Sequence, residues 1–136
     1  MIVYLDASAV VPLIKAEDSS EAVAGYFDDL LTDGHLLVGG QLLETEVRRA
    51  AIRQGIDDRT ASEALAAVNL VAHQGSDFVR AGSLPYPNLG SLDAMHLATA
   101  LRIGVDCMIT FDTRLEAAAQ DSGLEVLDTS IPRTFI

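Results

Sequence analysis

Short apolar runs alternate with segments of helical periodicity along most of this chain. The runs are too short for independent helices and are rich in β-branched residues, so they are predicted to be buried strands. Strands that alternate with helices form a parallel sheet whose two faces are both covered, which predicts an α/β fold. The expected strands cover residues 2–5, 35–38, 107–110 and 125–127.

The segments between these runs carry the end signals of helices, such as the Asp33-Gly34 and Gln54-Gly55 pairs. Residues 84–90 are expected to form a loop, because two prolines interrupt any regular structure there. Asn69–His73 fits either a further strand or a continuation of the preceding helix. The expected helices cover residues 8–15, 20–32, 57–67, 77–83, 92–102 and 113–122, together with a helix around Glu46 that ends near residue 54.

The length of 136 residues is that of one domain, and we expect residues 1–136 to form a single unit. The amino terminus enters a strand without the regions of a signal peptide, and no run is long enough to span a membrane. The one cysteine, Cys107, lies in an expected buried strand and cannot form an internal disulfide. This pattern fits a reducing, cytoplasmic setting.

The formal net charge of −11 at pH 7 conflicts with the simplest kind of nucleic-acid binder. Two bound divalent cations would still leave the chain acidic. A polyanionic substrate would therefore have to be attracted by metals and local arginines, whereas the overall field favours a basic protein partner.

Asp6 and Asp112 follow two of the expected strands. In an open parallel sheet, ligands bind beyond the carboxyl ends of the strands, so both carboxylates are expected at that edge. Asp106 precedes its strand and is expected at the opposite edge. The first two aspartates are therefore candidates for a functional site, and the third is not.

Glu46 and Asp93 are placed by helical periodicity. Glu46 falls within the apolar stripe of its helix, whereas Glu44 shares the polar face with Arg48 in an i,i+4 pair. Asp93 lies in the first turn of the helix expected over residues 92–102, on the row that faces the core. A carboxylate aimed at a core is costly to desolvate unless it is paired or binds metal, and this chain has few cationic partners.

Four converging carboxylates without a histidine and cysteine cluster are the ligands that Mg²⁺ or Mn²⁺ prefers. Such ions can orient a water and stabilise the leaving oxygen of a phosphodiester. Helix capping is an equally good explanation for each aspartate taken singly. Capping does not explain Glu46, which lies well inside its helix. The four together favour metal-assisted phosphoryl chemistry, with Asp6, Glu46, Asp93 and Asp112 as catalytic and metal-binding residues.

Three polar residues near these acids are candidates for supporting roles. Ser8, two residues after Asp6, can orient that carboxylate or a bound water, and it is equally well explained as an early helix residue. Thr110 is a similar, weaker case. Arg114 follows Asp112 closely and is favoured as a contact for substrate phosphates.

The three histidines are less informative. His96 lies three residues after Asp93 and could be a ligand or an acid–base group, but a histidine on a half-buried helix is more typical of a structural residue. His35 and His73 have no constellation of functional residues around them in the sequence.

Four segments, taken in order, resemble the motifs of PIN-domain ribonucleases. They are Val-Tyr-Leu-Asp-Ala-Ser-Ala at 3–9, Thr-Glu-Val-Arg-Arg-Ala at 45–50, Leu-Asp-Ala-Met-His-Leu-Ala-Thr-Ala-Leu at 92–101 and Ile-Thr-Phe-Asp at 109–112. Within that superfamily the chain resembles the VapC-type toxins of bacterial type II toxin–antitoxin systems, over essentially its whole length. The segment from residue 92 to residue 98 is the most specific part of the resemblance.

The resemblance implies a three-layer α/β/α sandwich with a central parallel sheet and Mg²⁺- or Mn²⁺-dependent endoribonuclease activity. It also implies a homodimer and a cognate antitoxin whose basic tail crosses the acidic cleft. One departure is Gly39-Gly40, where relatives often have serine or threonine just before the helix that bears the glutamate. The resemblance places Asp6, Glu46, Asp93 and Asp112 on the family's acidic positions, and Ser8 and Thr110 on its polar supporting positions.

Two other classes stay open on the residues alone. Receiver domains and phosphoaspartyl phosphatases also gather acids at strand ends, but they need a lysine near the last strand or a second aspartate at position 8. The only lysine here is Lys15, and position 8 is a serine. A non-catalytic module would use its acids as helix caps and bind a basic partner without metal.

Overall fold

The computed structural model of the protein describes residues 1–15 and 20–129. Within these residues, five strands form one sheet in the order β3-β2-β1-β4-β5, and every neighbouring pair is parallel. The chain builds the sheet outward from β1 on one side and then on the other. The strands are β1 (Ile2–Leu5), β2 (Leu36–Gly40), β3 (Asn69–Val71), β4 (Cys107–Ile109) and β5 (Glu125–Val126).

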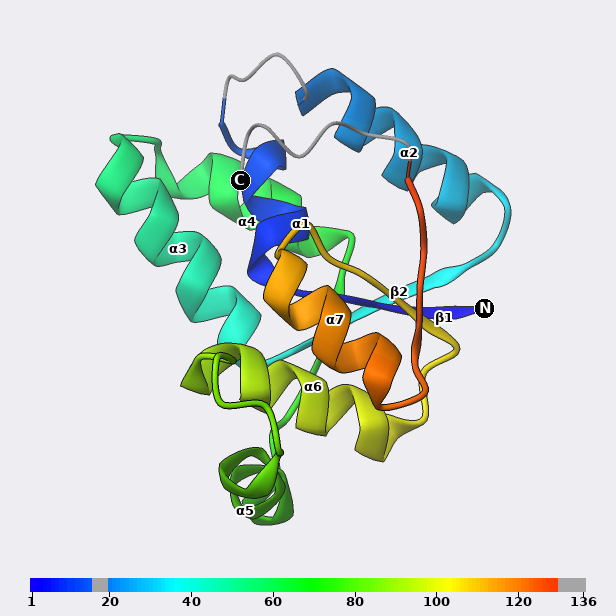
Figure 1. The fold of residues 1–136 in the computed structure, drawn as a ribbon. Coiled ribbons are helices and arrows are strands. Elements are labelled where there is room, and N and C mark those ends of the chain that lie inside the picture. Colours follow the sequence, from blue (N-terminus) through cyan, green and yellow to red (C-terminus); the bar gives the residue numbers. More distant parts are fainter. Residues whose placement is uncertain (16–19, 130–136) are drawn as a thin grey trace.

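Helices connect the strands and cover both faces of the sheet (Figure 1). Two of them, α3 and α6, end at glycines with positive φ, Gly55 at 67° and Gly104 at 73°, a conformation that other residues rarely adopt. The helical elements are α1 (Ala7–Val10), the short 3₁₀ helix η1 (Val11–Leu13), α2 (Ser20–Thr32), α3 (Leu42–Gln54), α4 (Asp58–Ala66), α5 (Gly75–Ser83), α6 (Ser91–Ile103) and α7 (Thr113–Asp121).

The alternation of side chains along β1 divides the core into two layers. Val3 and Leu5 belong to the apolar cluster that packs against α1 to α4, whereas Tyr4 belongs to the cluster with Leu97 of α6 and Leu115 of α7. All of these side chains are fully buried. Because successive residues of a strand point to opposite faces, one short strand anchors both helical layers. The α/β/α sandwich with a central parallel sheet is thereby confirmed.

The structure corrects several element boundaries. The single helix expected over residues 8–15 is wrong: α1 begins at Ala7 and gives way to η1, in which Pro12 lacks the N–H that a continuing α-helix would need. Strand β2 extends to Gly40, two residues beyond the expected end. Residues 69–71 form a strand, which settles the alternative left open by the sequence.

Two further expectations concern burial and membrane spans. Cys107 is fully buried, and burial raises the pKa of its thiol to about 11, so the reactive thiolate is disfavoured. In the part of the chain that the structure describes, no helix has both the length and the apolar composition needed to cross a membrane.

Candidate metal centre

The four candidate carboxylates lie at the carboxyl edge of the sheet. Asp6 follows β1 and Asp112 follows β4, and these two strands are neighbours. Glu46 comes from the second turn of α3, and Asp93 from the first turn of α6. The charge of Asp93 acts on Asp6, and the charges of Asp112 and Glu46 act on Asp93. The structure therefore brings all four acids into one electrostatic cluster.

Asp6 is almost completely buried, with 2% of its surface exposed. It is the N-cap residue of α1, yet its two carboxylate oxygens accept from Ser8 Oγ, at 2.9 and 3.0 Å, rather than from a backbone N–H of that helix. Burial, together with the charge of Asp93, raises the pKa of Asp6 to about 6, although His96 and the hydroxyls of Ser8 and Thr110 oppose the shift. Helix capping therefore does not account for Asp6.

The other two aspartates behave differently from one another. Asp112 does cap α7, because its Oδ1 accepts from the backbone N–H groups of Arg114 at 2.9 Å and Leu115 at 3.1 Å. Asp93 is half-buried in the first turn of α6, and burial followed by the charge of Asp112 raises its pKa. Of the three aspartates, capping thus explains Asp112. Asp6 and Asp93 instead have pKa values raised by burial and by a neighbouring carboxylate.

Ser8 and Thr110 join the ends of β1 and β4. Besides its bond to Asp6, Ser8 Oγ accepts from the backbone N–H of Phe111 at 2.8 Å and lies 3.1 Å from Thr110 Oγ1. Thr110 Oγ1 in turn accepts from the backbone N–H of Asp112 at 3.1 Å. These contacts join the backbone of the two strand ends, and the role of both hydroxyls in supporting a metal site stays a prediction.

Among the residues that the structure describes, the partner of Glu46 is His96 and not an arginine. Glu46 Oε1 accepts from His96 Nε2 at 2.5 Å, and the His96 side chain is fully buried while that of Glu46 is 18% exposed. Burial lowers the pKa of His96, but the hydrogen bond and charge of Glu46, together with the charges of Asp6 and Asp93, outweigh it, so the net shift is upward. Glu44 pairs with Arg48 at 3.5 Å, as the sequence predicts.

A hard divalent cation fits this donor set. The donors are carboxylate oxygens, and two of the aspartates have pKa values raised by burial and mutual repulsion, which a bound cation would relieve. Among the residues that the structure describes, no three acidic, histidine or cysteine groups already stand close enough together to share an ion. Binding of an ion by three of these acids would therefore require their side chains to move closer together.

Arg114 stands beside the acids at the start of α7. Its side chain is exposed, its charge acts on Asp93, and it lines a hollow of about 510 Å³ between the 84–90 loop and α7. Pro85, Tyr86 and Asn88 form the loop side of this hollow. The structure thus places a cation at the junction between the acidic cluster and an open surface depression.

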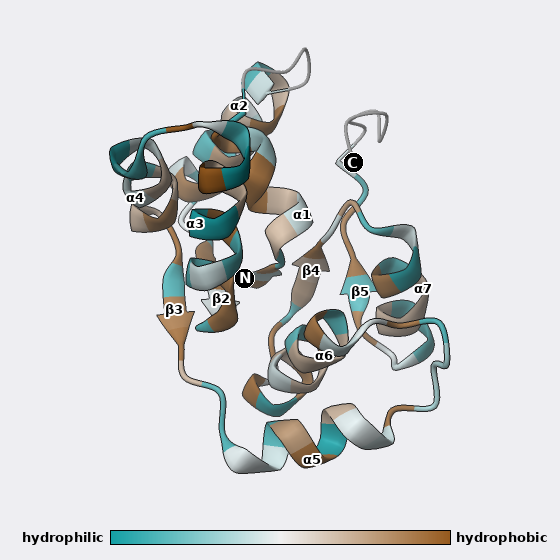
Figure 2. Cartoon of the chain, turned by 90° about the vertical axis from the view of Figure 1, so that its left-hand side faces the viewer, coloured by the Kyte–Doolittle hydropathy of each residue, from teal (hydrophilic) through white to brown (hydrophobic). Residues whose placement is uncertain are grey.

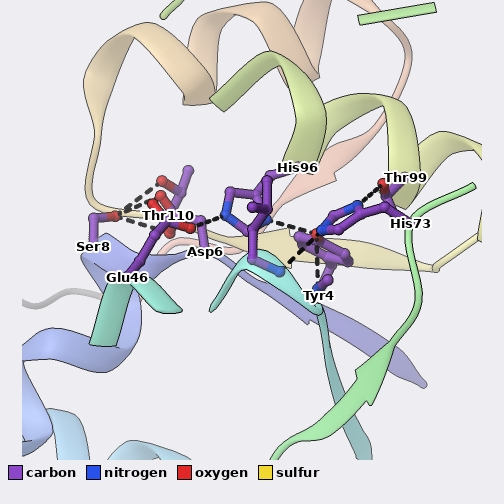
Figure 3. A network of polar contacts seen from close by, with 10 residues as sticks. Tyr4, Asp6, Ser8, Glu46, His73, His96, Thr99 and Thr110 are labelled. Carbon is purple, nitrogen blue, oxygen red and sulfur yellow. Dashed lines mark hydrogen bonds and ion pairs between the residues drawn. The ribbon is translucent and has the colours of Figure 1, made fainter. Parts of the chain in front are cut away.

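The expectation that His73 has no constellation around it is wrong. The N–H of Leu42 donates to His73 Nε2 at 3.1 Å, His73 Nδ1 contacts Thr99 Oγ1 at 2.7 Å, and the His73 ring lies edge-on to that of His96, with centroids 6.2 Å apart (Figure 3). Linear spacing gives no signal for these contacts, because His73 lies in the connection between β3 and α5. By contrast His35 Nδ1 lies at the edge of the protein, 2.9 Å from the exposed amino terminus of Met1.

The chain resembles known proteins both in sequence and in fold. The PIN-domain family model matches residues 3–121, so the chain belongs to the PIN-domain family. It is similar to a ribonuclease VapC46 of Mycobacterium tuberculosis, with 38% identity over 94% of this chain and 98% of the relative. Its fold matches VapBC2 of Rickettsia felis bound to a promoter DNA fragment (TM-score 0.72, 12% identity, 93% of this chain and 98% of that one). It also matches a toxin–antitoxin complex from Klebsiella pneumoniae (TM-score 0.68, 20% identity, 93% and 97%).

Proposed function

We propose that this protein is a divalent-metal-dependent endoribonuclease and the toxin of a toxin–antitoxin pair. The observation that carries the proposal is the buried Asp6 carboxylate, which is crowded by Asp93 and is not used to cap its helix. Membership of the PIN-domain family and 38% identity to a protein named ribonuclease VapC46 support RNA as the substrate class. A receiver-type phosphotransfer domain has no comparable support.

Each acid has a role in this proposal. Asp6, Glu46 and Asp93 would hold a Mg²⁺ or Mn²⁺ ion, and Asp112, which keeps one oxygen on its helix N-terminus, would complete the site. The cation would lower the pKa of a water and neutralise charge on the phosphodiester. Water oxygen would bond to phosphorus as the bond to O3′ breaks, giving 5′-phosphate and 3′-hydroxyl ends. Ser8 and Thr110 would keep the Asp6 carboxylate in place throughout.

Removal of metal tests the activity. We expect the purified protein to cleave a structured RNA with Mn²⁺ or Mg²⁺, to lose cleavage in excess EDTA, and to regain it when Mn²⁺ is restored. In the same assay Arg114→Ala should raise KM about tenfold through the lost phosphate contact, whereas Arg59→Ala, an exposed α4 residue paired with Glu63, should change nothing. Cleavage that is indifferent to EDTA would overturn the proposal.

The proposed partners follow from charge. The net charge of −11 suits an antitoxin with a basic tail that lies over the acidic cluster, and one structural neighbour is a toxin–antitoxin complex. Such a partner should inhibit cleavage in the assay above. RNA must approach against the same overall field, so local positive charge at Arg114 gains importance.

A homodimer is the remaining proposal. Phe78 and Val79 of α5 and Leu92 of α6 are 60%, 73% and 49% exposed, and Phe78 and Leu92 line one apolar hollow of about 370 Å³. Figure 2 shows α5 at the lower edge of the molecule, beneath α6. Exposed apolar residues gathered in this way typically mark an association surface.

Sedimentation measures the dimer directly. The wild-type protein should sediment as a dimer at micromolar concentration and Phe78→Asp as a monomer, because a buried unpaired carboxylate opposes association. Leu31→Asp on α2, 40% exposed, is the matched control and should leave the dimer intact. A Phe78→Asp protein that still sediments as a dimer would exclude this face.

A further inference from the structure

A buried chain of hydrogen bonds runs from Glu46 to the backbone of β2 (Figure 3). His96 Nε2 lies 2.5 Å from Glu46 Oε1, and His96 Nδ1 lies 2.7 Å from the hydroxyl of Tyr4. The Gly40 N–H donates to the same hydroxyl at 2.9 Å. Tyr4 and His96 are both fully buried, so these side chains have no water to replace their partners.

The donors and acceptors in this series of hydrogen bonds fix the orientation of the His96 imidazole ring. A carboxylate has only acceptor sites, so His96 Nε2 donates to Glu46 whatever the charge of the ring. Burial raises the pKa of the Tyr4 hydroxyl above its usual range, so this group keeps its proton and stays neutral. The hydroxyl is itself held by Gly40, a rigid part of β2. A backbone group therefore determines, through two side chains, where one oxygen of Glu46 lies.

A second histidine, the partly buried His73, packs against the His96 ring from the side. Because the Leu42 N–H donates to His73 Nε2, that nitrogen accepts, and His73 Nδ1 is left to donate to Thr99 Oγ1. Thr99 Oγ1 donates onward to Asp77 Oδ2 at 3.2 Å. The His73 ring packs edge-on against His96. His73 thus supports both the first residue of α3, the helix that carries Glu46, and the His96 ring that binds Glu46.

The glycine at position 40 makes this arrangement possible. A Cβ atom added to Gly40 would lie 2.6 Å from His73 Nε2 and 2.7 Å from the Tyr4 hydroxyl, closer than real Cβ contacts come. No larger residue fits here while Tyr4 and His73 keep their places. The second glycine of the pair before α3, a departure at the sequence level, is explained by the Tyr4 hydroxyl and the His73 imidazole, which occupy its side-chain space. The first, Gly39, lies against Leu43 instead, 2.7 Å from where a Cβ would be.

We infer that His96 is a positioning residue that, through Tyr4 and the Gly40 N–H, orients the Glu46 carboxylate for a divalent cation. The inference rests on the proposed function, in which Glu46 is a ligand. His96 binds only one of the two Glu46 oxygens, so the other is available to a cation. Residues that orient a metal ligand typically contribute 10- to 100-fold to metal affinity.

Calorimetric titration with MnCl₂ tests the inference without relying on activity. His96→Leu, which keeps bulk but removes both nitrogens, should bind Mn²⁺ about 10- to 100-fold more weakly, and Tyr4→Phe about tenfold more weakly. His96→Gln should stay within about threefold of wild type, because its amide N–H can donate at the position of Nε2. In the metal-free Tyr4→Phe protein, the Gly40 amide proton resonance should shift, since its acceptor is gone.

Val23→Ala, in the fully buried part of α2, controls for lost stability: its melting temperature should fall while its Mn²⁺ affinity stays unchanged. Wild-type Mn²⁺ affinity in Tyr4→Phe and His96→Leu would overturn the inference. If His96→Leu does not fold, Tyr4→Phe decides alone in the same way. Absence of Mn²⁺ binding by the wild-type protein would instead refute the proposed function, so the two failures are distinguishable.

Discussion

Replacing Asp6 by Asn is expected to abolish RNA cleavage and at the same time to stabilise the metal-free protein near neutral pH. Loss of a metal ligand should reduce kcat at least about 1,000-fold, which corresponds to about 4 kcal/mol of lost transition-state stabilisation. The gain in stability arises because Asn removes a buried negative charge beside Asp93 while keeping an oxygen that can accept from Ser8. Function and stability are therefore expected to oppose one another at this position.

The pH dependence of the free energy of unfolding shows whether Asp6 stabilises or destabilises the folded protein. The pKa of Asp6 is about 6 in the folded protein against 3.8 for an ordinary aspartate, so the folded state holds the proton more tightly. Below about pH 4 both states are protonated, and the contribution to stability is fully present. As the pH rises through 6, this contribution to the free energy of unfolding is lost, by about 3 kcal/mol, because Asp6 ionises at a lower pH in the unfolded state than in the folded state.

The measurement is the free energy of unfolding in EDTA, compared between Asp6→Asn and wild type from pH 4 to pH 7.5. The difference should grow with pH and level off above 6, and the other titrating groups largely cancel in it. Asp29→Asn, on the exposed face of α2, removes the same charge without burial and should show no such trend. A variant that cleaves RNA, or one that is less stable than wild type at pH 7.5, would contradict this account.

Replacing Glu46 by Gln should weaken Mn²⁺ binding by more than about 100-fold with little effect on the fold. The amide keeps an oxygen for His96 Nε2 but lacks the charge that a hard cation requires. Calorimetric titration at pH 7.5 measures the affinity. Glu46 lies inside its helix, where a capping role is not possible, so its contribution discriminates clearly between a metal site and a set of helix caps.

The same helix supplies the control. Glu44 lies two residues earlier, on the outer face, where it pairs with Arg48. Glu44→Gln removes the same charge from the same helix and should leave Mn²⁺ affinity within about twofold of wild type, since exposed charges outside the cluster are screened. Equal weakening by both substitutions would mean that net charge alone, and not a specific ligand, governs binding.

Much of the fold follows from local signals in the sequence. The apolar runs of β1 and β4 and the glycines that end α3 and α6 are strong signals because each depends on neighbouring residues only. The strand at 69–71 is short, lies at the edge of the sheet and has no buried residue, so its pattern is weak. Pro12 is also a local signal, because a proline interrupts an α-helix. The prediction of a single helix over residues 8–15 did not take it into account.

The residues of the candidate site are likewise only partly predictable from the sequence. Asp6 and Asp112 are predictable because they follow strands, and Glu46 because it interrupts an apolar stripe. The support behind them is not predictable, because its hydrogen bonds join residues distant in sequence: Tyr4 to His96 across 92 positions and Leu42 to His73 across 31. Periodicity identifies which face of an element is buried, but it does not identify the residue that contacts that face.

The order of the sheet has a consequence for the growing chain. Asp6 and Glu46 belong to the part that builds β1, β2 and β3, whereas Asp93 and Asp112 belong to the part that adds β4 and β5 on the other side of β1. A product of interrupted synthesis that ends before residue 90 holds only half of the acids. It also lacks α6, whose His96 contacts Glu46. On the proposed function, a chain that ends before residue 90 is expected to be inactive, because it lacks two of the four acids and the helix that supports a third.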